Sequence, residues 1–581
     1  MGRRANASAL ALVTTFACAC ASAAPNNCSW WYETTKHGSA FRNVKDYGAI
    51  GDGVTDDTAA LRAAINAGDT GTNGTSLAKS AAVVYFPAGV YNVHATIVVW
   101  FWTIIVGNPL PGCASTIELA PASSSFGNPR ALQPVVAANG GFNSTATDEA
   151  WWRTDRGIGG HANDLFYASV RDIVIRVREG NDGAVALYWP VAQQTAIRNV
   201  DIVLISGAIG LDFAGLDYAV PFSPSIGGGG LVEGVRVRGG SLGMRLAGSQ
   251  WSFVDISIAN ATTACVLSKS LIWTHTFVRL HAERCPVALS LSGAIGSVMI
   301  LDSLLGPGLG PTAIETDATS GIFLQNVGVA GNTQFVIDAV LPAPASGSVI
   351  GVWARGPVYE SGHRADVNRS GRALELPSSA AAIAAGLPLS CHTVQGGGSP
   401  SLCGGSREDP GTGIPMAPRP SFVGERVDNA VTDFGAVGDG IHDDTDALAA
   451  ALRRPNSVTF LPFGTYAVRG GVLVLGCNAS LVGEGLSAIA LMANQSQVPS
   501  SSFIPLLATQ GVTCRATVVD VCLTTLGTGN DGVVLLDHSA GPASGFYDVT
   551  MRIVYRVGLK ARLGVEGEPG GAGILSNTWW W

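Results

Sequence analysis

Short apolar segments recur along the chain, and polar residues and turn signals separate them. These segments are rich in Val, Ile, Leu and Phe, which is typical of short buried strands joined by tight turns. Six of them are Val170–Ile175, Ile197–Ile202, Phe253–Ile258, Phe277–Leu280, Val298–Leu301 and Phe323–Val327. The pattern predicts β-strands throughout this region and argues against an all-α architecture.

The later strands are evenly spaced. The matching polar positions Asp255, Arg279, Asp302 and Asn326 lie 24, 23 and 24 residues apart. This spacing is typical of one coil of a solenoid in which each strand stacks on the next. A β-sandwich would need hairpin turns every ~8 to 12 residues, and Asn-Gly or Asp-Gly hairpin sequences are few here. We therefore predict a parallel β-helix.

One block of sequence occurs twice. Asp46–Gly53 with Asp56–Thr58 recurs as Asp433–Gly440 with Asp443–Thr445, at an offset of 387 residues. Each copy is followed by a helical pattern, a strand that enters a turn, and a Val-Gly pair. These are Ala59–Asn66, Tyr85–Tyr91 and Val106–Gly107 in the first copy, and Ala447–Arg453, Phe460–Tyr466 and Val482–Gly483 in the second. Three landmarks in the same order predict two copies of one module.

The repeat sets the expected domain organisation. We predict a signal peptide at 1–24, a first β-helix module at 30–370 and a second module at 426–581 that stops early. A linker rich in Gly, Ser and Pro at 377–421 separates the two modules. The expected fold class is all-β, with tandem right-handed parallel β-helices of the pectin-lyase-like kind, the second one incomplete.

The N-terminus has the composition of a secretory signal. Arg3 and Arg4 precede an apolar stretch from Leu10 to Cys20, and Ala21-Ser22-Ala23 supplies a small-residue cleavage site. The apolar stretch is too short to span a bilayer about 30 Å thick. We therefore expect a secreted, extracellular protein, and N-glycosylation triplets fit that location. They begin at Asn27, Asn73, Asn143, Asn260, Asn368, Asn478 and Asn494.

Charge and cysteine content narrow the choice of partners. The formal net charge is −8 without a Lys/Arg cluster, so neither nucleic acid nor an anionic membrane is expected as a partner. Two of the 11 cysteines fall in the signal, and the odd number left leaves at least one unpaired. We expect disulfides, including a local one between Cys391 and Cys403, and neither a metal nor a cofactor.

The repeated block gathers three carboxylates, Asp52, Asp56 and Asp57, which invites a metal-binding or catalytic interpretation. The same residues also suit a turn and the N-cap of the helix that follows. Both module copies need such a turn at the helix start, so we favour the structural role.

Several segments together carry a resemblance to a known family. They are Asn163–Ile175, Tyr188–Asn199, Gly243–Ala264, Gly545–Arg552 and Gly570–Trp581, in addition to the repeated block. With them the chain resembles family 55 glycoside hydrolases, secreted exo-β-1,3-glucanases built from two tandem β-helices. The resemblance implies inverting hydrolysis, in which a carboxylic acid protonates the leaving oxygen while water attacks the opposite face.

The resemblance also implies site residues. Gln193 falls on the family's Ala-Gln pair, and its carbonyl oxygen can orient the nucleophilic water, although an amide is no strong base. Ser576 stands where the family carries Glu, and the general acid is expected about one coil beyond Trp581. Trp189, Trp579 and Trp581 are candidates for sugar binding, because aromatic faces suit the C–H faces of pyranose rings.

Three functions remain open at this point. The first is a secreted β-1,3-glucan hydrolase, exo-acting and inverting. The second is a catalytically inactive β-helix that binds a polysaccharide. The third is another pectate-lyase-like polysaccharide-degrading enzyme, for which the Gly-Asn-Asp-Gly turns at 180–183 and 529–532 are hints. Each implies a polysaccharide partner, and we expect a monomer.

Overall fold

The computed structural model describes most of the chain. The described residues are 28–68, 81–138, 165–213, 228–271, 274–291, 296–316, 321–329, 349–360, 363–373, 420, 422, 424–469, 472–492, 504–526, 533–541, 543–552, 573–576 and 579–580. The expected signal peptide and the expected disulfide between Cys391 and Cys403 lie outside these residues, as does nearly all of the expected linker.

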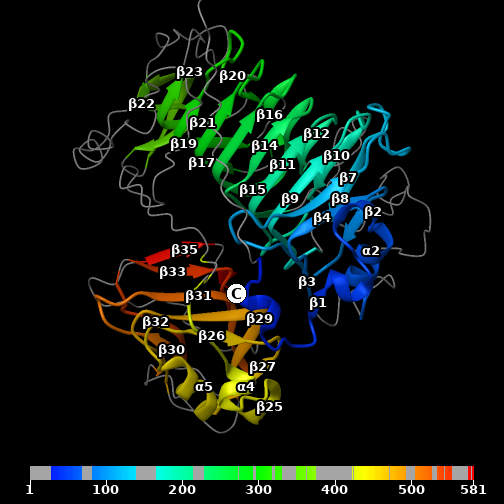
Figure 1. Cartoon of the computed structure of the whole chain (residues 1–581). Coiled ribbons are helices and arrows are strands. Elements are labelled where there is room, and N and C mark those ends of the chain that lie inside the picture. Colours follow the sequence, from blue (N-terminus) through cyan, green and yellow to red (C-terminus); the bar gives the residue numbers. More distant parts are fainter. Residues whose placement is uncertain are drawn as a thin grey trace, which may run out of the picture.

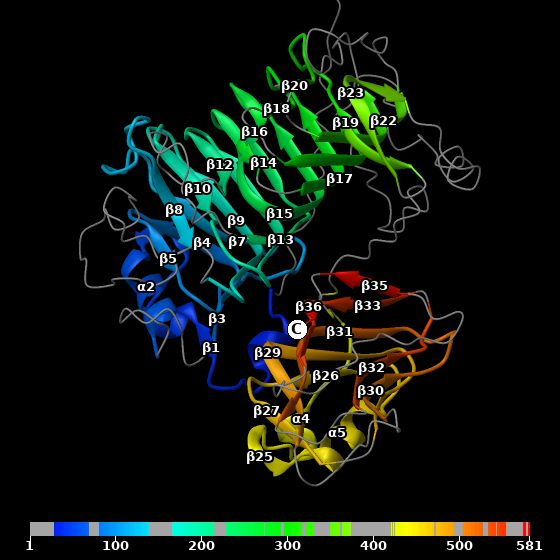
Figure 2. The same cartoon turned by 180° about the vertical axis from the view of Figure 1, so that it is seen from behind.

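Two solenoids of β-strands make up the described chain (Figure 1). The first runs from blue to green and the second from yellow to red, and Figure 2 shows their successive coils from behind. Almost all strand pairs are parallel, which confirms the expected all-β fold of tandem parallel β-helices. Among the described residues, no helix combines the length and apolar character needed to cross a membrane.

The strands of the first solenoid are β1 (Phe41–Asn43), β2 (Asp52–Asp56), β3 (Ala82–Tyr85), β4 (Gly89–Val93), β5 (Ile97–Val99), β6 (Thr103–Val106), β7 (Ser115–Leu119), β8 (Gln133–Ala138), β9 (Ser169–Val177), β10 (Ala184–Tyr188), β11 (Ala196–Leu204), β12 (Ile209–Asp212), β13 (Gly228–Glu233), β14 (Arg236–Gly239), β15 (Leu242–Ala259), β16 (Ala264–Leu271), β17 (Thr274–Glu283), β18 (Leu289–Leu291), β19 (Ser297–Leu305), β20 (Ile314–Thr316), β21 (Gly321–Val329), β22 (Val349–Glu360) and β23 (His363–Ala373). Those of the second are β24 (Val427–Asn429), β25 (Asp439–Asp443), β26 (Val458–Leu461), β27 (Thr465–Val468), β28 (Leu473–Leu475), β29 (Ala479–Met492), β30 (Ile504–Thr509), β31 (Ala516–Leu526), β32 (Val533–His538), β33 (Ser544–Tyr547), β34 (Thr550–Arg552), β35 (Gly573–Ser576) and β36 (Trp579–Trp580). The described helices are α1 (Trp31–Thr34), the 3-10 helix η1 (Val44–Tyr47), α2 (Thr58–Asn66), α4 (Ala430–Phe434) and α5 (Thr445–Leu452).

Each coil pairs in register with the next. Val170 in β9 pairs with Ile197 in β11, and Phe253 in β15 pairs with Phe277 in β17. The six strands predicted from the hydrophobic pattern lie within β9, β11, β15, β17, β19 and β21. The exception to parallel pairing is at the end of the first solenoid, where β22 and β23 pair antiparallel.

The evenly spaced polar residues occupy one bend of successive coils. Asp255, Arg279, Asp302 and Asn326 all have positive φ, between 49° and 56°. Their side chains contact one another from coil to coil: Arg279 pairs with Asp255, and Asn326 Nδ2 donates to Asp302 Oδ1 at 2.8 Å. Asp and Asn tolerate this left-handed backbone conformation. Because one such residue recurs at the bend of each coil, the coil length was visible as a regular spacing in the sequence.

Side chains that point inward form a continuous apolar core in each solenoid. In the first, Ile175, Ile202, Val237 and Ile258 stack in one row of paired strands, and all are completely buried. Burying one such side chain stabilises the fold by about 1.5–3 kcal/mol. Because every coil repeats the row, stability is spread along the solenoid.

The repeated Asp block makes the same turn in both modules. Asp57 accepts from the backbone N of Ile50 and Gly51, and Asp444 accepts from Val437 and Gly438. The predicted turn is thus confirmed. The predicted N-cap differs in detail, because Asp57 makes no capping bond and Asp56 instead accepts from the first helical N–H, that of Thr58.

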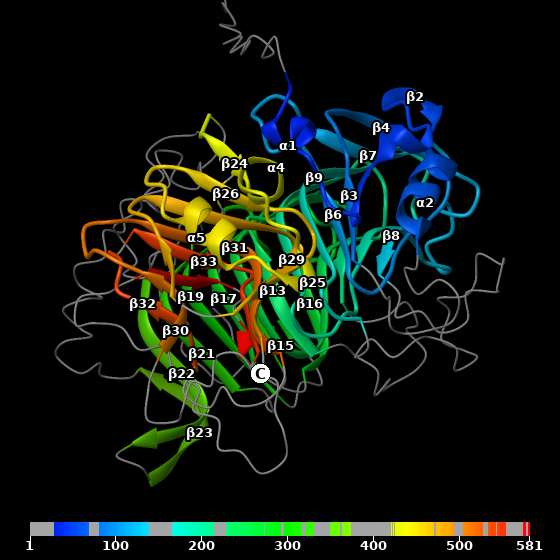
Figure 3. The ribbon, with the colours of Figure 1, turned by 90° about the horizontal axis from the view of Figure 1, so that it is seen from below.

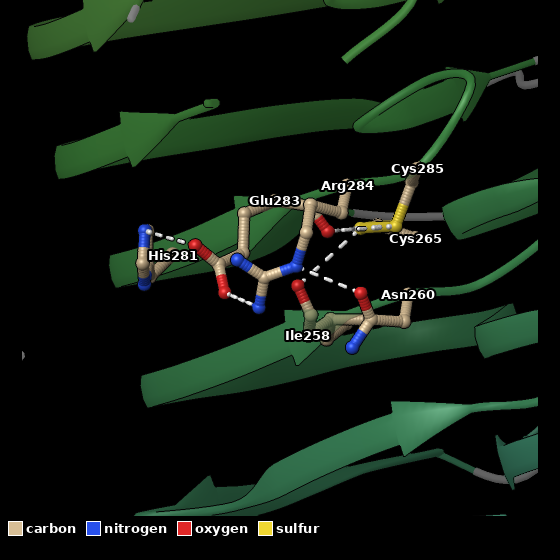
Figure 4. Close-up of a disulfide and its surroundings, with 7 residues drawn as sticks. All are labelled: Ile258, Asn260, Cys265, His281, Glu283, Arg284 and Cys285. Carbon is tan, nitrogen blue, oxygen red and sulfur yellow. Dashed lines mark hydrogen bonds and ion pairs between the residues drawn. A yellow bond between two sulfur atoms is a disulfide. The ribbon is translucent and has the colours of Figure 1, made fainter. Parts of the chain in front are cut away.

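Three disulfides are described. Cys265–Cys285 joins two successive coils of the first solenoid, beside Asn260 and Arg284 (Figure 4). Cys28–Cys113 fixes the start of the described chain to the first solenoid, and Cys477–Cys514 lies in the second. Among the described cysteines, Cys522 is free, in agreement with the odd number predicted.

A third apolar cluster joins the two solenoids. Tyr85 and Val106 from the first pack in it with Phe460, Val482 and Val519 from the second. Figure 3 shows α1 beside this junction, next to α4 and β24. The two solenoids thus meet along an apolar seam that continues into a polar pocket.

Candidate active site between the two solenoids

A pocket opens where the seam between the solenoids becomes polar. Its lining residues are Ile104, Tyr167, Ser169, Gln194 and Ala196 from the first solenoid and Leu486, Asp520 and Asp548 from the second. The space among these residues, about 320 Å³, includes open solvent at its mouth. Both solenoids are needed to form it, because neither supplies the whole lining.

Gln194 contributes the amide of the pocket. It precedes β11 with a φ of 56°, which turns its side chain toward the second solenoid. There its Nε2 donates to Thr550 Oγ1. Its Oε1 is buried and makes no hydrogen bond with any described residue. A buried acceptor without a partner is costly, so this oxygen is suited to accept a hydrogen bond from a water or a hydroxyl in the pocket.

Asp520 contributes a buried carboxyl that retains its proton unusually well. Asp520 occupies a bend of its coil, with a φ of 54°. Its Oδ2 accepts a hydrogen bond from Arg171 Nη1 at 2.8 Å. Burial, helped by the nearby Asp548, raises the pKa of Asp520 to about 7, although Arg171 acts in the opposite direction. A carboxyl with such a pKa can donate a proton at neutral pH.

A second guanidinium links the pocket to the rest of the first solenoid. Arg198 Nη2 donates to Asp548 Oδ1 at 3.2 Å, and Arg198 Nη1 pairs with Glu233. Burial raises the pKa of Glu233, and Arg198 only partly offsets that shift. The resulting network contains three carboxyls and two guanidinium groups, all of them buried except Asp548, which is partly exposed.

Gln193 lies directly beside the pocket residue. It is half-buried, and the lining contains its neighbour Gln194. The sequence thus located the turn that brings Gln194 into the pocket, and the role predicted for Gln193 stays a prediction. Sequence reasoning missed Asp520 and Asp548, although both stand at the bend position of successive coils, with φ of 54° in each. That recurrence was the available signal.

The remaining predicted residues fall in different places. Trp189 is completely buried in the core of the first solenoid, away from any surface that a sugar could contact. Ser576 ends β35 and pairs with Tyr547, and Trp579 begins β36 and pairs with Thr550. Trp581 lies outside the described residues. Within the described part of the chain, no group of three His, Cys, Asp or Glu side chains is arranged to hold a metal ion.

Two packed parallel β-helices with a polar pocket at their junction define a double-solenoid protein of the pectate-lyase-like class. The family profile described as "Rhamnogalacturonase A/epimerase, pectate lyase-like" matches residues 41–289 and 429–505, more than half of the chain. The chain belongs to this family.

Curated relatives include fungal glucanases. A "Probable glucan endo-1,3-beta-glucosidase" of Arthroderma benhamiae is 29% identical over 348 residues, which cover 57% of this chain and 36% of that protein. A "Glucan 1,3-beta-glucosidase" of Cochliobolus carbonum is 27% identical over 477 residues, 77% of this chain and 53% of that protein. The chain thus spans about half, or less, of the length of these relatives.

Among solved structures, the catalytic unit of a GH87 α-1,3-glucanase from Streptomyces thermodiastaticus aligns with 94% of this chain and 70% of its own. The TM-score is 0.31 and the sequence identity 12%.

Proposed function

We propose that this protein is a secreted hydrolase of β-1,3-glucan, acting from chain ends with inversion. The names of the two fungal relatives support the substrate class. The observation that carries the proposal is the pocket itself, which places a proton-retaining carboxyl and an unsatisfied amide oxygen at the junction of the solenoids. Inverting hydrolysis uses an acid that protonates the leaving oxygen and a second group that directs water to the opposite face, and these two side chains are our candidates for those roles.

In this proposal the amide oxygen of Gln194 accepts a hydrogen bond from the attacking water and fixes its direction. A carboxylic acid protonates the glycosidic oxygen, so that the C1–O bond breaks and water adds to C1 from the opposite face, releasing its second proton to the solvent at the open mouth of the pocket. Within the described chain, Asp520 is the pocket carboxyl whose raised pKa suits proton donation.

The first experiment incubates the purified chain with a soluble β-1,3-glucan and follows glucose release together with its anomeric form. Prompt release of α-glucose supports an inverting exo-hydrolase whose acid lies within this chain. Release of longer oligosaccharides alone contradicts exo action.

The two neighbouring glutamines form a matched pair. We expect Gln194→Ala to reduce kcat by about 100-fold or more, in the range seen for the loss of one positioned catalytic partner. Gln193→Ala should change it less than about threefold, because Gln193 does not line the pocket. Steady-state kinetics on the same glucan measures both. A larger loss of kcat in Gln193→Ala than in Gln194→Ala would assign the water-orienting role to Gln193.

A second candidate function is binding of glucan without hydrolysis. The feature that favours it is Ser576, which stands where the resembling family carries a carboxylate. Co-sedimentation with insoluble β-1,3-glucan, in the absence of any glucose release, is the result that identifies such a binding protein.

A further inference from the structure

The segment 28–38 lies between the two solenoids and contacts both. The disulfide Cys28–Cys113 ties it to the first solenoid. On its other side the ring of Trp31 meets that of Phe460 at 5.4 Å, and Asn429 Nδ2 donates to the carbonyl oxygen of Lys36 at 2.8 Å. The segment therefore acts as a link across the junction.

The segment 28–38 forms hydrogen bonds with a buried carboxylate of the second solenoid. Glu484 lies in β29, and its side chain is completely buried. Its Oε2 accepts from the backbone N of Gly38 at 2.7 Å and of Phe463 at 2.8 Å, while its Oε1 lies 2.6 Å from His37 Nδ1. The approach is so close that a Cβ at Gly38 would lie 2.5 Å from the backbone N of Phe463.

The hydrogen-bond partners of His37 determine how many protons His37 and Glu484 hold together. His37 Nδ1 faces Glu484, and His37 Nε2 lies 2.6 Å from the carbonyl oxygen of Tyr32. A carbonyl oxygen only accepts, as does a carboxylate. Both contacts are therefore satisfied only when the pair carries one proton more than a neutral imidazole beside a carboxylate, whichever of the two side chains holds it.

We propose that His37 and Glu484 form a proton-dependent clasp that holds the two solenoids together. Glu484 is followed by Gly485 and Leu486, which both have positive φ in a bulge of β29. Leu486 lines the pocket, and Trp102 Nε1 donates to the carbonyl oxygen of Gly485 at 3.1 Å. The clasp thus also positions one wall of the pocket. Its effect on hydrolysis rests on the proposed function, whereas its effect on docking does not.

Other ionisable groups surround the clasp. Tyr32 and Tyr466 both interact with Glu484, and burial raises the pKa of each phenol well above 10, so both remain neutral. Deeper in the junction, Arg171 is charged and paired with Asp520. Glu33 and Lys36, on the same segment as His37, are exposed.

The docked state binds the extra proton, so docking is favoured at low pH. By linkage, a state that binds one more proton is disfavoured as the pH rises. Asp520, with a pKa raised to about 7, titrates in the same direction. The test must therefore compare variants as well as pH values.

Hydrogen–deuterium exchange of the full chain measures docking directly, with peptides covering 28–48 and 479–492. At about pH 8, compared with about pH 5.5, we expect exchange about tenfold faster after correction for the intrinsic rate. In His37→Gln the exchange should be fast at both pH values. Glu484→Gln should likewise abolish the difference between them.

The matched control is His442→Gln. His442 Nδ1 also lies 2.6 Å from a carboxylate, that of Asp439, but on the exposed surface of one solenoid. This variant should exchange as the wild type does. The clasp is refuted if His37→Gln keeps the wild-type acceleration at high pH, or if the wild type shows none. Because no glucan is used, neither result depends on hydrolytic activity.

Discussion

At the scale of single residues, several carboxyl and guanidinium groups meet at the junction. Three carboxyls, Asp520, Asp548 and Glu233, face two guanidinium groups, Arg171 and Arg198. Burial raises the pKa of both Asp520 and Glu233. Among these groups, Asp520, with a pKa of about 7, holds a proton well above the usual range of a carboxyl.

This network predicts a pH dependence of stability. Because the pKa of Asp520 rises from 3.8 to about 7 on folding, the folded chain binds more protons than the unfolded chain in that window. The free energy of unfolding therefore falls as the pH rises, by about 1.4 kcal/mol per pH unit for one proton. Asp520→Asn should remove this slope in urea denaturation between about pH 4.5 and pH 7. Asp46→Asn, at an exposed position, should keep it, and an unchanged slope in Asp520→Asn would contradict the assignment.

The choice between two adjacent glutamines shows what residue patterns leave open. The Ala-Gln pair located a turn at the start of a strand. Which amide enters the pocket depends on the positive φ of Gln194 and on Thr550, a partner 356 residues away. Neither can be deduced from local sequence, and the burial of Trp189 was hidden for the same reason.

At the scale of elements, the sequence was more informative. Strand positions followed from the recurring short β-rich segments, and the coil length followed from the bend residues Asp255, Arg279, Asp302 and Asn326. The antiparallel pair β22 and β23 left no such signal, because alternation is the same in both orientations. The repeated Asp block was interpreted correctly as a turn, since its hydrogen bonds are local.

The inward row of each coil carries the stability of the solenoid. We expect Ile202→Ala to destabilise the chain by about 2–5 kcal/mol, because Ile202 is completely buried and its loss leaves a cavity. Ile205, which follows the same strand, is 58% exposed, and Ile205→Ala should change stability by less than about 0.5 kcal/mol. Chemical denaturation measures both. Equal effects would mean that the inward and outward rows are assigned wrongly.

At the scale of the whole molecule, the docking of the two solenoids is the feature that sequence patterns could not supply. The contacts that fix it join residues far apart in the chain, such as Arg171 with Asp520 and His37 with Glu484. Each looks unremarkable in its own segment. The internal repeat predicted two modules, but a repeat contains no information on which faces meet.

The labelling rate of the free thiol of Cys522 offers a way to measure the docking of the two solenoids. Cys522 lies in β31 of the second solenoid, close enough to Tyr167 of the first to influence the pKa of its hydroxyl. Burial raises the pKa of the thiol to about 11, and the thiolate is the reactive form. At about pH 5.5, where the clasp holds the wild type docked, we expect a maleimide to label Cys522 slowly in the wild type and about tenfold faster in His37→Gln. Mass mapping of the labelled peptide checks this, and equal rates would show that the thiol does not sense the junction. The labelling of Cys522 thus reports separation of the two solenoids and needs neither a substrate nor an added fluorophore.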